Sequence, residues 1–316
     1  MLIPLLLTLA CTKDEVQDST PQDTQGQEAP DPETVPLAGA CPLDEAWGGF
    51  SVQASEEPNN NGIDGKVSDS IWPWSELEEI ASDGDCKLLR RNLPFCTPSC
   101  DVGTTCDFDG QCVPEPSNQD LGTVTVKGLV QEVSMEAAIG NTYYDTSLPY
   151  PMYTAGDLVT LKNSGGTYGA QTLYGVAVEP LSLDAVEWFI TKGEPLEITW
   201  DAPTAAVSRS VIDLRINMDV HGASPASLYC TFEDDGAATV SGALTKTLVE
   251  AGVTGFPSGA LERHTTDSVD LDPGCMAFSV RSPVIMAVDV DGFTPCFTDE
   301  ECPEGLTCNT ELQICE

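Results

Sequence analysis

The sequence predicts a mainly β protein, in which an antiparallel β-sandwich lies between two small disulfide-rich modules. Three observations lead to this prediction. Apolar and polar residues alternate along several short segments between residues 119 and 290, a pattern typical of strands with one buried face. Long helical patterns do not separate these segments, which favours antiparallel sheets packed face to face. Cysteines cluster at 96–112 and again at 296–315.

The chain is strongly acidic, since 51 Asp and Glu against 13 Lys and Arg give a net charge of -38 over 316 residues. Nucleic acids and anionic lipid surfaces are bound through clustered basic side chains. The composition therefore argues against both as partners. Hydrophobic residues make up 41% of the chain, which is enough for a folded core.

Residues 1–10 form an apolar run that is too short to span a bilayer but suits an export signal. The run ends in Thr8-Leu-Ala-Cys11, which resembles the lipobox of bacterial lipoproteins. The resemblance implies a signal peptide and lipidation cysteine over 1–11, a palmitate-type membrane anchor on Cys11 and, because Thr12 follows, retention at the cell outer membrane. An ordinary signal peptide with an incidental cysteine is the alternative.

Residues 12–40 are rich in Asp, Glu, Gln, Thr and Pro and carry few large aliphatic side chains. Such a segment cannot bury enough apolar area to offset the entropy lost on ordering. We expect a disordered acidic tether that holds a folded body away from a membrane.

Twelve cysteines follow Cys11, an even number that fits an exported disulfide protein. The pattern Cys-x2-Gly-x-Thr-Cys begins at Cys100 and again at Cys302. We interpret the two clusters as copies of one small module, in which crosslinks replace a hydrophobic core. The clusters consist of Cys96, Cys100, Cys106 and Cys112, and of Cys296, Cys302, Cys308 and Cys315.

The second cluster, over 296–315, resembles the Dickkopf N-terminal and EB-type cysteine-rich modules. Similar cysteine runs occur in lipoproteins of myxobacteria. The resemblance implies a small disulfide fold and no activity. Zinc binding is the alternative, but zinc sites favour closely spaced cysteine pairs, whereas five-residue spacers dominate here. Three pairings stay open within each cluster.

Four of the twelve cysteines after Cys11 lie outside the clusters, at Cys41, Cys86, Cys230 and Cys275. Their order along the chain predicts the disulfides Cys41–Cys86 and Cys230–Cys275. Each would close a loop of about 45 residues and contribute around 4 kcal/mol in the chain-entropy model.

Three folded regions are expected after the tether: a small β module over 41–118, the sandwich over 119–290 and a cysteine module over 291–316. In the first region, Asp83-Gly84 before an apolar run favours a hairpin over a capped helix at 75–82. In the sandwich, alternating residues predict strands around 124–126, 196–200, 212–220, 228–232 and 276–280.

One helix is expected over 243–251, because Leu244 and Leu248 lie one turn apart and Gly252 can end the helix. The segment 193–203 resembles the opening strand of Ig-like bacterial surface domains. The resemblance implies an Ig-like sandwich, and a jelly-roll-like sandwich stays open as the other arrangement.

Sequence motifs for catalysis are absent: the chain has no Gly-x-Ser-x-Gly, no His-Glu-x-x-His and no phosphate-binding glycine loop. The two histidines are His221, expected in a turn at a strand end, and His264, expected in an exposed loop. We therefore predict no catalytic residue. Among so many carboxylates, pairs for acid–base work are always available, so no pair is singled out.

Two segments place carboxylates at alternate positions before a glycine, namely Asp107 with Asp109 and Asp289 with Asp291. Calcium prefers several hard oxygen ligands at such bends. These four residues are the candidate metal ligands, and calcium is the one cofactor considered. An ordinary Asp-Gly turn is the alternative at both places.

Four of the seven tyrosines lie within eleven residues, at Tyr143, Tyr144, Tyr150 and Tyr153. Tyrosines on a proline-stiffened loop can stack on sugars or peptides with little loss of entropy. They are the candidate ligand-binding residues. Packing over the open end of the sandwich is the alternative.

Together these features predict a lipid-anchored protein of the cell envelope or surface with a non-catalytic role in binding, adhesion or structure. Its expected partners are the membrane, through the lipid, and an extracellular protein or glycan. The first alternative is a secreted hydrolase that uses carboxylates or His221. A metal or redox protein that uses a cysteine cluster is the second.

Overall fold

The computed structural model describes residues 30–55, 60–183, 185, 187–205, 208–218 and 226–316. Cys11, most of the predicted tether and His221 lie outside this part of the chain. Residues Asp31–Glu316 form one compact unit. No helix among the described residues is long and apolar enough to cross a lipid bilayer.

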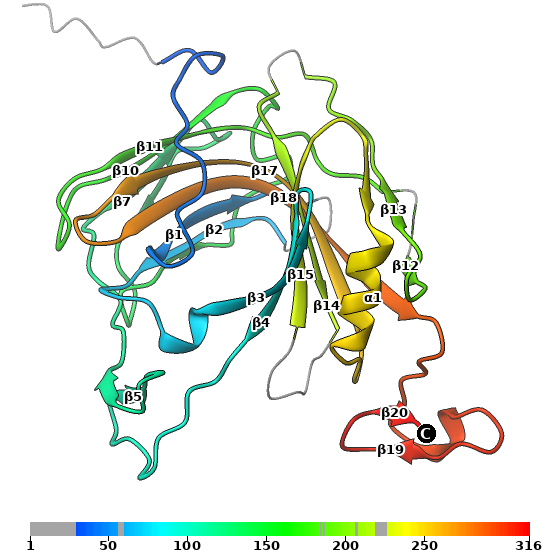
Figure 1. The fold of residues 1–316 in the computed structure, drawn as a ribbon. Helices are drawn as coiled ribbons and strands as arrows, with labels where there is room; N and C mark the ends of the chain where they lie inside the picture. The colour runs from blue at the N-terminus through cyan, green and yellow to red at the C-terminus, as the bar shows by residue number, and fades with distance from the viewer. Residues whose placement is uncertain (1–29, 56–59, 184, 186, 206–207, 219–225) are drawn as a thin grey trace, which may run out of the picture. The chain divides into compact units, whose positions relative to one another are not determined.

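The fold is mainly β, as predicted, and its centre is a ten-stranded sheet (Figure 1). Nine strands follow one another across the sheet, and β12 (Glu187–Ile190) joins at β18. In order across the sheet, the nine are β3 (Leu77–Asp83), β4 (Cys86–Arg91), β15 (Ala226–Glu233), β14 (Val211–Asn217), β17 (Ser258–Asp270), β18 (Cys275–Val290), β1 (Ala46–Gln53), β2 (Gly62–Val67) and β9 (Tyr143–Asp145).

The long hairpin of β17 and β18 runs through the whole sheet and pairs over thirteen residues. Most neighbouring strands are antiparallel, as the alternation predicts. The exceptions lie along the outer edge of β18, where β1 and then β12 pair with it in parallel. The large sheet therefore contains parallel and antiparallel pairs, and both parallel pairs involve β18.

One face of the large sheet is covered by two further layers, each over its own core. The first layer is a four-stranded sheet of β11 (Thr172–Val176), β10 (Leu158–Asn163), β7 (Val124–Lys127) and β8 (Val133–Met135). Its core holds Phe50, Val126, Leu161 and Phe278. This packing of one sheet on another is the predicted sandwich.

The second layer consists of the paired strands β13 (Leu196–Thr199) and β16 (Ala237–Val240) and the helix α1 (Gly242–Glu250). The core beneath holds Trp200, Ile212, Leu214 and Leu248. Trp200, Ile212 and Leu214 are apolar positions of the predicted alternating strands, and Leu248 lies on the predicted helix.

The predicted helix is confirmed, with bounds close to 243–251. Ser241 lies before the first turn, and its hydroxyl accepts a hydrogen bond from the Leu244 amide, which caps the N-terminus. Gly252 follows the helix with φ of +115°, a conformation that glycine adopts without steric cost.

The region 41–118 is not the separate module that the sequence predicts. Its strands β1 to β4 belong to the large sheet, and β4 pairs with β15. The hairpin of β3 and β4 is confirmed. Among the described residues of this region, β5 (Thr104–Cys106) and β6 (Cys112–Pro114) form a separate two-stranded sheet in a small disulfide module. The tether also ends earlier than predicted, because Val35 is buried.

All twelve cysteines from Cys41 onward are paired, but the two long-range disulfides differ from the prediction. Cys41 pairs with Cys275, and Cys86 pairs with Cys230. The reason is the strand order: β4 lies beside β15, and their register places Cys86 opposite Cys230. The predicted pairing of cysteines in sequence order is wrong, because strands that are neighbours in the sheet are far apart along the chain.

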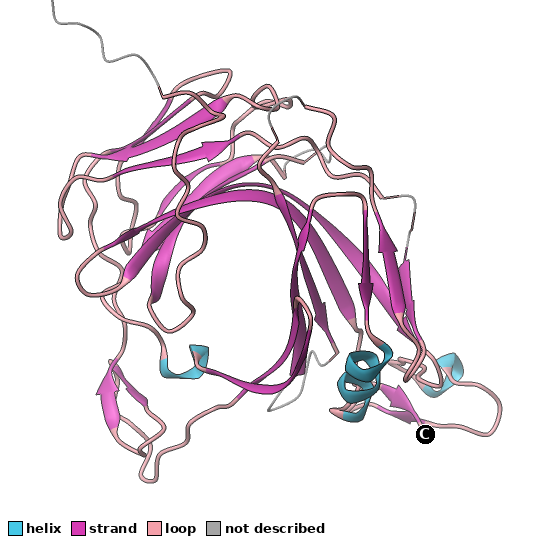
Figure 2. Cartoon of the chain, turned by 45° about the horizontal axis from the view of Figure 1, so that its top comes forward, coloured by secondary structure: helices cyan, strands magenta, loops and turns pink. Residues whose placement is uncertain are grey.

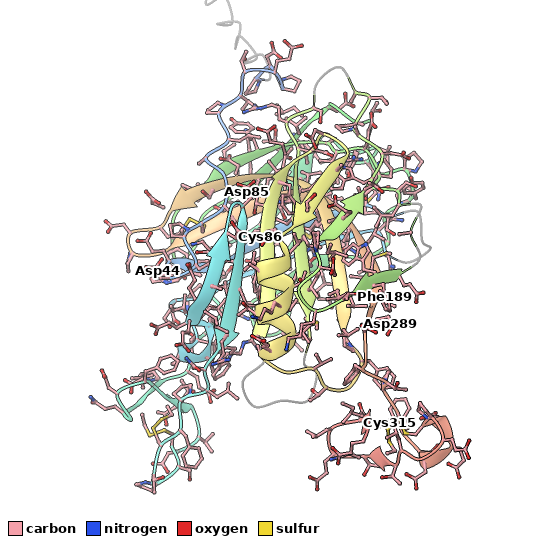
Figure 3. The ribbon with its side chains drawn as sticks, turned by 45° about the vertical axis from the view of Figure 1, so that its right-hand side comes forward. Asp44, Asp85, Cys86, Phe189, Asp289 and Cys315 are labelled. Carbon is pink, nitrogen blue, oxygen red and sulfur yellow. A yellow bond between two sulfur atoms is a disulfide. The ribbon has the colours of Figure 1, made fainter. Side chains whose placement is uncertain are left out.

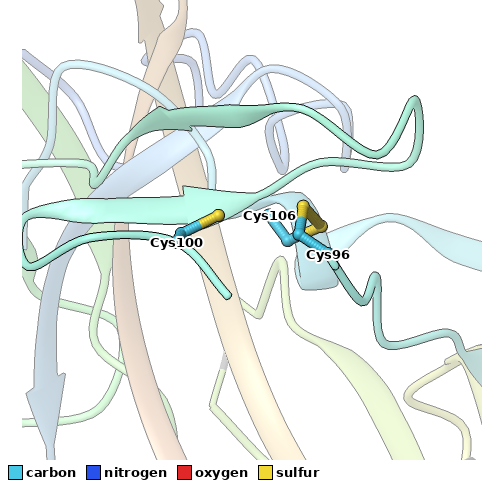
Figure 4. A group of neighbouring side chains, drawn as sticks. All are labelled: Cys96, Cys100 and Cys106. Atoms are coloured by element: carbon cyan, nitrogen blue, oxygen red, sulfur yellow. A yellow bond between two sulfur atoms is a disulfide. The ribbon is translucent and has the colours of Figure 1, made fainter. Parts of the chain in front are cut away.

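The two cysteine modules share one connectivity, in which the first cysteine joins the third and the second joins the fourth. Figure 4 shows the disulfide between Cys96 and Cys106, with Cys100 beside it. The same order recurs in the C-terminal module around β19 (Cys308–Asn309) and β20 (Ile314–Cys315). The other three pairs are Cys100–Cys112, Cys296–Cys308 and Cys302–Cys315. This agreement supports the interpretation of an internal repeat.

Two short 3-10 helices complete the described elements: Pro73–Ser75 before β3, and Asp299–Glu301 in the C-terminal module. A phenylalanine pair connects that module to the body, because the ring of Phe297 stacks on that of Phe256 at 4.7 Å between centroids.

A candidate binding groove

The second face of the large sheet carries a groove of about 1020 Å³. The sheet curves, so that this face is its inner side, while the two covering layers lie outside (Figure 2). Side chains alternate between the faces along each strand. On β14, Ile212 and Leu214 therefore enter the core, and Asp213 and Arg215 line the groove.

Strand register brings the charged groups of the groove together. Asp213 on β14 lies opposite Glu262 on β17, and opposite Thr231 on β15. One step along β17, His264 lies opposite Arg281 on β18. Three strands that are distant in sequence thus place one cluster of titratable side chains on the inner face.

Two ion pairs connect this cluster. His264 Nε2 lies 3.0 Å from Asp213 Oδ2, and Arg281 Nη1 donates to Glu262 Oε2 at 3.2 Å. The hydroxyl of Thr231 donates to Asp213 Oδ1 at 2.6 Å. The other ring nitrogen of His264, Nδ1, lies 2.8 Å from the hydroxyl oxygen of Thr266. Both carboxylates therefore already have cationic partners.

The environment shifts the pKa values of these groups in different directions. Burial opposes the charged form of His264, but the contact with Asp213 and the charge of Glu262 outweigh it, so the pKa of His264 is raised. Burial would raise the pKa of Asp213, but His264 and Thr231 lower it overall. Burial dominates at Glu262 and raises its pKa despite the neighbouring Arg281.

These shifts predict that the protein is most stable in mildly acidic solution. The contribution of His264 is fully present below about pH 6.5 and is lost as the pH rises through its raised pKa. The contribution of Asp213 is present above about pH 3.8 and is lost as the pH falls through its lowered pKa. Glu262, with its raised pKa, is penalised when ionised and so also favours the acidic side.

His264→Gln is therefore expected to destabilise the protein by about 1–2 kcal/mol near pH 5.5 and by less at pH 8.5. The upper figure is modest because the side chain of Asp213 is 46% exposed and solvent screens the pair. Urea denaturation at both pH values measures the difference. An equal loss at the two values would contradict a charged pair.

The rest of the groove combines charge with apolar surface. Lys87 Nζ lies 3.2 Å from Glu79 Oε2, and both side chains are about half exposed. The Arg215 guanidinium lies over the Tyr229 ring, 5.3 Å from its centroid. Among the apolar residues that line the groove are Leu77, Leu89 and Ile285.

The expectation for His264 is wrong, because this residue lies in the middle of β17 and is only 7% exposed. The sequence did not predict β17, because both faces of this strand are partly buried and apolar residues therefore do not alternate with polar ones. The run of Thr265 and Thr266 was the available signal, since β-branched residues favour strands.

The two candidate calcium segments lie on different elements, and calcium binding at either stays a prediction. Asp107 Oδ1 accepts hydrogen bonds from the amides of Asp109 and Gln111, which is the geometry of an ordinary Asp turn. Asp289 lies exposed on β18, opposite Phe189 of β12 (Figure 3). Among the described residues, the groups of three potential metal-binding side chains within 4.8 Å are cysteines, and all of these are in disulfides.

The four candidate tyrosines divide into two pairs. Tyr143 and Tyr153 are buried in the sandwich core. The Tyr143 hydroxyl donates to Asp120 Oδ1 and accepts from the Leu121 amide. Tyr144 and Tyr150 are 62% and 41% exposed. Tyr143 and Tyr153 therefore pack in the core, and a role in ligand recognition stays a prediction for Tyr144 and Tyr150.

Comparisons with known proteins give this chain no family. No family model and no curated protein matches it. Among solved structures, the chicken CNTN1 FN1-FN3 domains match at 8% identity with a TM-score of 0.20, over 68% of this chain and 65% of that one. A similarity at this TM-score carries no argument about the fold or function of this chain. Any function assigned to the groove must therefore be argued from the geometry of the groove itself.

Proposed function

We propose that this chain is a lipid-anchored protein of the cell surface that binds an extracellular protein or glycan in the inner groove. The observation that carries the proposal is the groove itself: a large concave face in which Asp213 and Glu262 already have cationic partners. A concave site lined by apolar surface and a few converging polar groups is the usual form of a binding site.

The cysteines support the exported location. Six disulfides are stable in an oxidising compartment and rare in a reducing one. The lipobox-like residues before Cys11 support the anchor, and the acidic segment after it would hold the body away from the membrane. The net charge of -38 favours solubility at a cell surface.

An intact mass of the native protein from the membrane fraction tests the anchor. After thiol alkylation without reductant, we expect a chain that begins at Cys11, carries acyl groups and has no alkylated cysteine. A chain without acyl groups would refute the anchor. Several alkylated cysteines would refute the exported location.

A hydrolase is the second candidate, and one observation favours it. Asp213 and Glu262 are cross-strand neighbours whose pKa values shift in opposite directions, as in enzymes that pair an acid with a base. Both oxygens of Asp213 and Oε2 of Glu262 already have partners, which favours binding over proton transfer. If the protein released reducing sugar ends from oligosaccharides and Glu262→Gln abolished that release, a hydrolase would become the favoured function.

A further inference from the structure

We propose that the ligand of the inner groove is an uncharged oligosaccharide. This inference depends on the proposed binding function and narrows its two ligand classes to one. Three properties of the groove point the same way: its balanced charge, the kind of polar groups on its floor, and the apolar and aromatic surface beside them.

The charge of the groove contrasts with that of the chain. Its described lining residues include three acidic and three basic side chains, although acids outnumber bases about fourfold overall. These are Asp85, Asp213 and Glu262, and Lys87, Arg215 and Arg281. The field of the whole protein repels an anionic ligand. A cationic ligand would have to compete with His264 and Arg281 for carboxylates that are already paired. An uncharged ligand meets neither obstacle.

Most of the floor of the groove offers side chains rather than free backbone groups. It is the face of a sheet, whose amides and carbonyls bond to neighbouring strands within the sheet plane. A peptide that adds to a sheet binds at an edge, through main-chain hydrogen bonds. One such edge lines the groove, at residues 282–285 of β18, but Pro283 within it has no amide to donate. Here the ligand is read by hydroxyl, amide, carboxylate and guanidinium groups, such as those of Tyr229, Gln53, Asp213 and Arg215. These donors and acceptors match the hydroxyls of sugars.

Aromatic and aliphatic surface lies beside these polar groups. Tyr229 is held by the Arg215 guanidinium over its ring and provides an amphipathic contact at low entropic cost. Ile285 is 73% exposed on the same face. Sugar rings have apolar C–H faces that stack on such side chains. The volume of about 1020 Å³ lies at the upper end of ligand pockets, which suits several linked sugars.

Two groove variants and two matched controls test the inference. Tyr229→Ala removes the aromatic contact, and Tyr174→Ala makes the same change on β11, outside the groove. Ile285→Arg introduces a bulky charge at an exposed groove position, and Phe189→Arg does so at an exposed apolar residue of β12. Because Ile285 and Phe189 are exposed, both arginine variants should keep the fold, and thermal melts check all four.

The full-length protein is first applied to an array of uncharged and carboxylated oligosaccharides and to a library of extended peptides. The best binder is then titrated calorimetrically against each variant. We expect an uncharged oligosaccharide to bind, with at least tenfold weaker affinity in Tyr229→Ala and Ile285→Arg and unchanged affinity in both controls. Equal affinity in groove and control variants would overturn the site.

Stronger binding of a carboxylated oligosaccharide or of a peptide, lost in the groove variants, would overturn the ligand class and leave the proposed binding function intact. Absence of binding to the whole array and library, by protein whose acylated mass and melting transition are normal, would overturn both. The two failures are therefore distinguishable.

Discussion

Asp234→Asn is expected to lower the free energy of unfolding by about 3–5 kcal/mol, because it leaves the Arg263 guanidinium buried without a counter-charge. Arg263 and Asp234 form an ion pair whose side chains are 1% and 3% exposed. Two hydrogen bonds join them, from Nε to Oδ2 at 2.7 Å and from Nη2 to Oδ1 at 3.1 Å. Such bidentate pairs are among the stronger polar contacts in proteins.

Asp234 also joins parts of the chain that share no strand. Its Oδ1 accepts from Trp200 Nε1 at 2.8 Å, and its Oδ2 accepts from the Ser210 hydroxyl at 2.6 Å. Arg263 donates to the carbonyl oxygens of Pro180 and Asp201. The pair thus connects β17 to the segments on either side of β13, and its loss should loosen the second core.

Equilibrium denaturation in urea measures the effect at neutral pH. Asp235→Asn is the matched control, because the neighbouring Asp235 is exposed, and we expect a change below about 0.5 kcal/mol there. Replacing both partners by Asp234→Leu and Arg263→Met should recover part of the loss, because it removes the unpaired charge but leaves Trp200 Nε1 without its acceptor. A loss in Asp234→Asn no greater than in the control would contradict the argument.

The sequence predicted the fold class because the strongest strands bury one face and expose the other. Ile212, Leu214 and Ile216 are all buried, and the residues between them are not. The same rule failed for the second half of β18, where Pro283 interrupts the pattern. Among the described strands, none pairs with residues 282–286 on the outer edge of β18. Proline is tolerated at such an edge because it lacks only an amide that has no ladder partner there.

The groove could not be predicted, because its residues come from strands that meet only in the fold. Asp213, Glu262 and Arg281 lie far apart along the chain and look like ordinary exposed charges. The burial of Arg263 could not be predicted for a related reason, since its ion pair with Asp234 and its bonds to backbone carbonyls form only in the fold. Local pattern thus predicted the strands with one buried face, such as β14, but missed β17, and the order of strands in the sheet decided which residues form the groove.

Strand order also decides the second large effect, which concerns the disulfide between Cys86 and Cys230. We expect Cys86→Ala with Cys230→Ala to lower the free energy of unfolding by about 4–5 kcal/mol, because this bond spans 144 residues and restricts the unfolded chain. Both cysteines are also buried in the second core, so the smaller side chains add a packing loss. Denaturation without reductant measures the change.

Cys96→Ala with Cys106→Ala is the control that separates loop length from cysteine removal. That bond spans only ten residues, and neither cysteine belongs to either core. Its loss should loosen the small module and leave the main unfolding transition within about 0.5 kcal/mol of the parent. If the two double variants lowered the main transition equally, the stabilisation would not come from the long loop. Mapping a peptide that joins Cys41 to Cys86 would show that β4 does not lie beside β15.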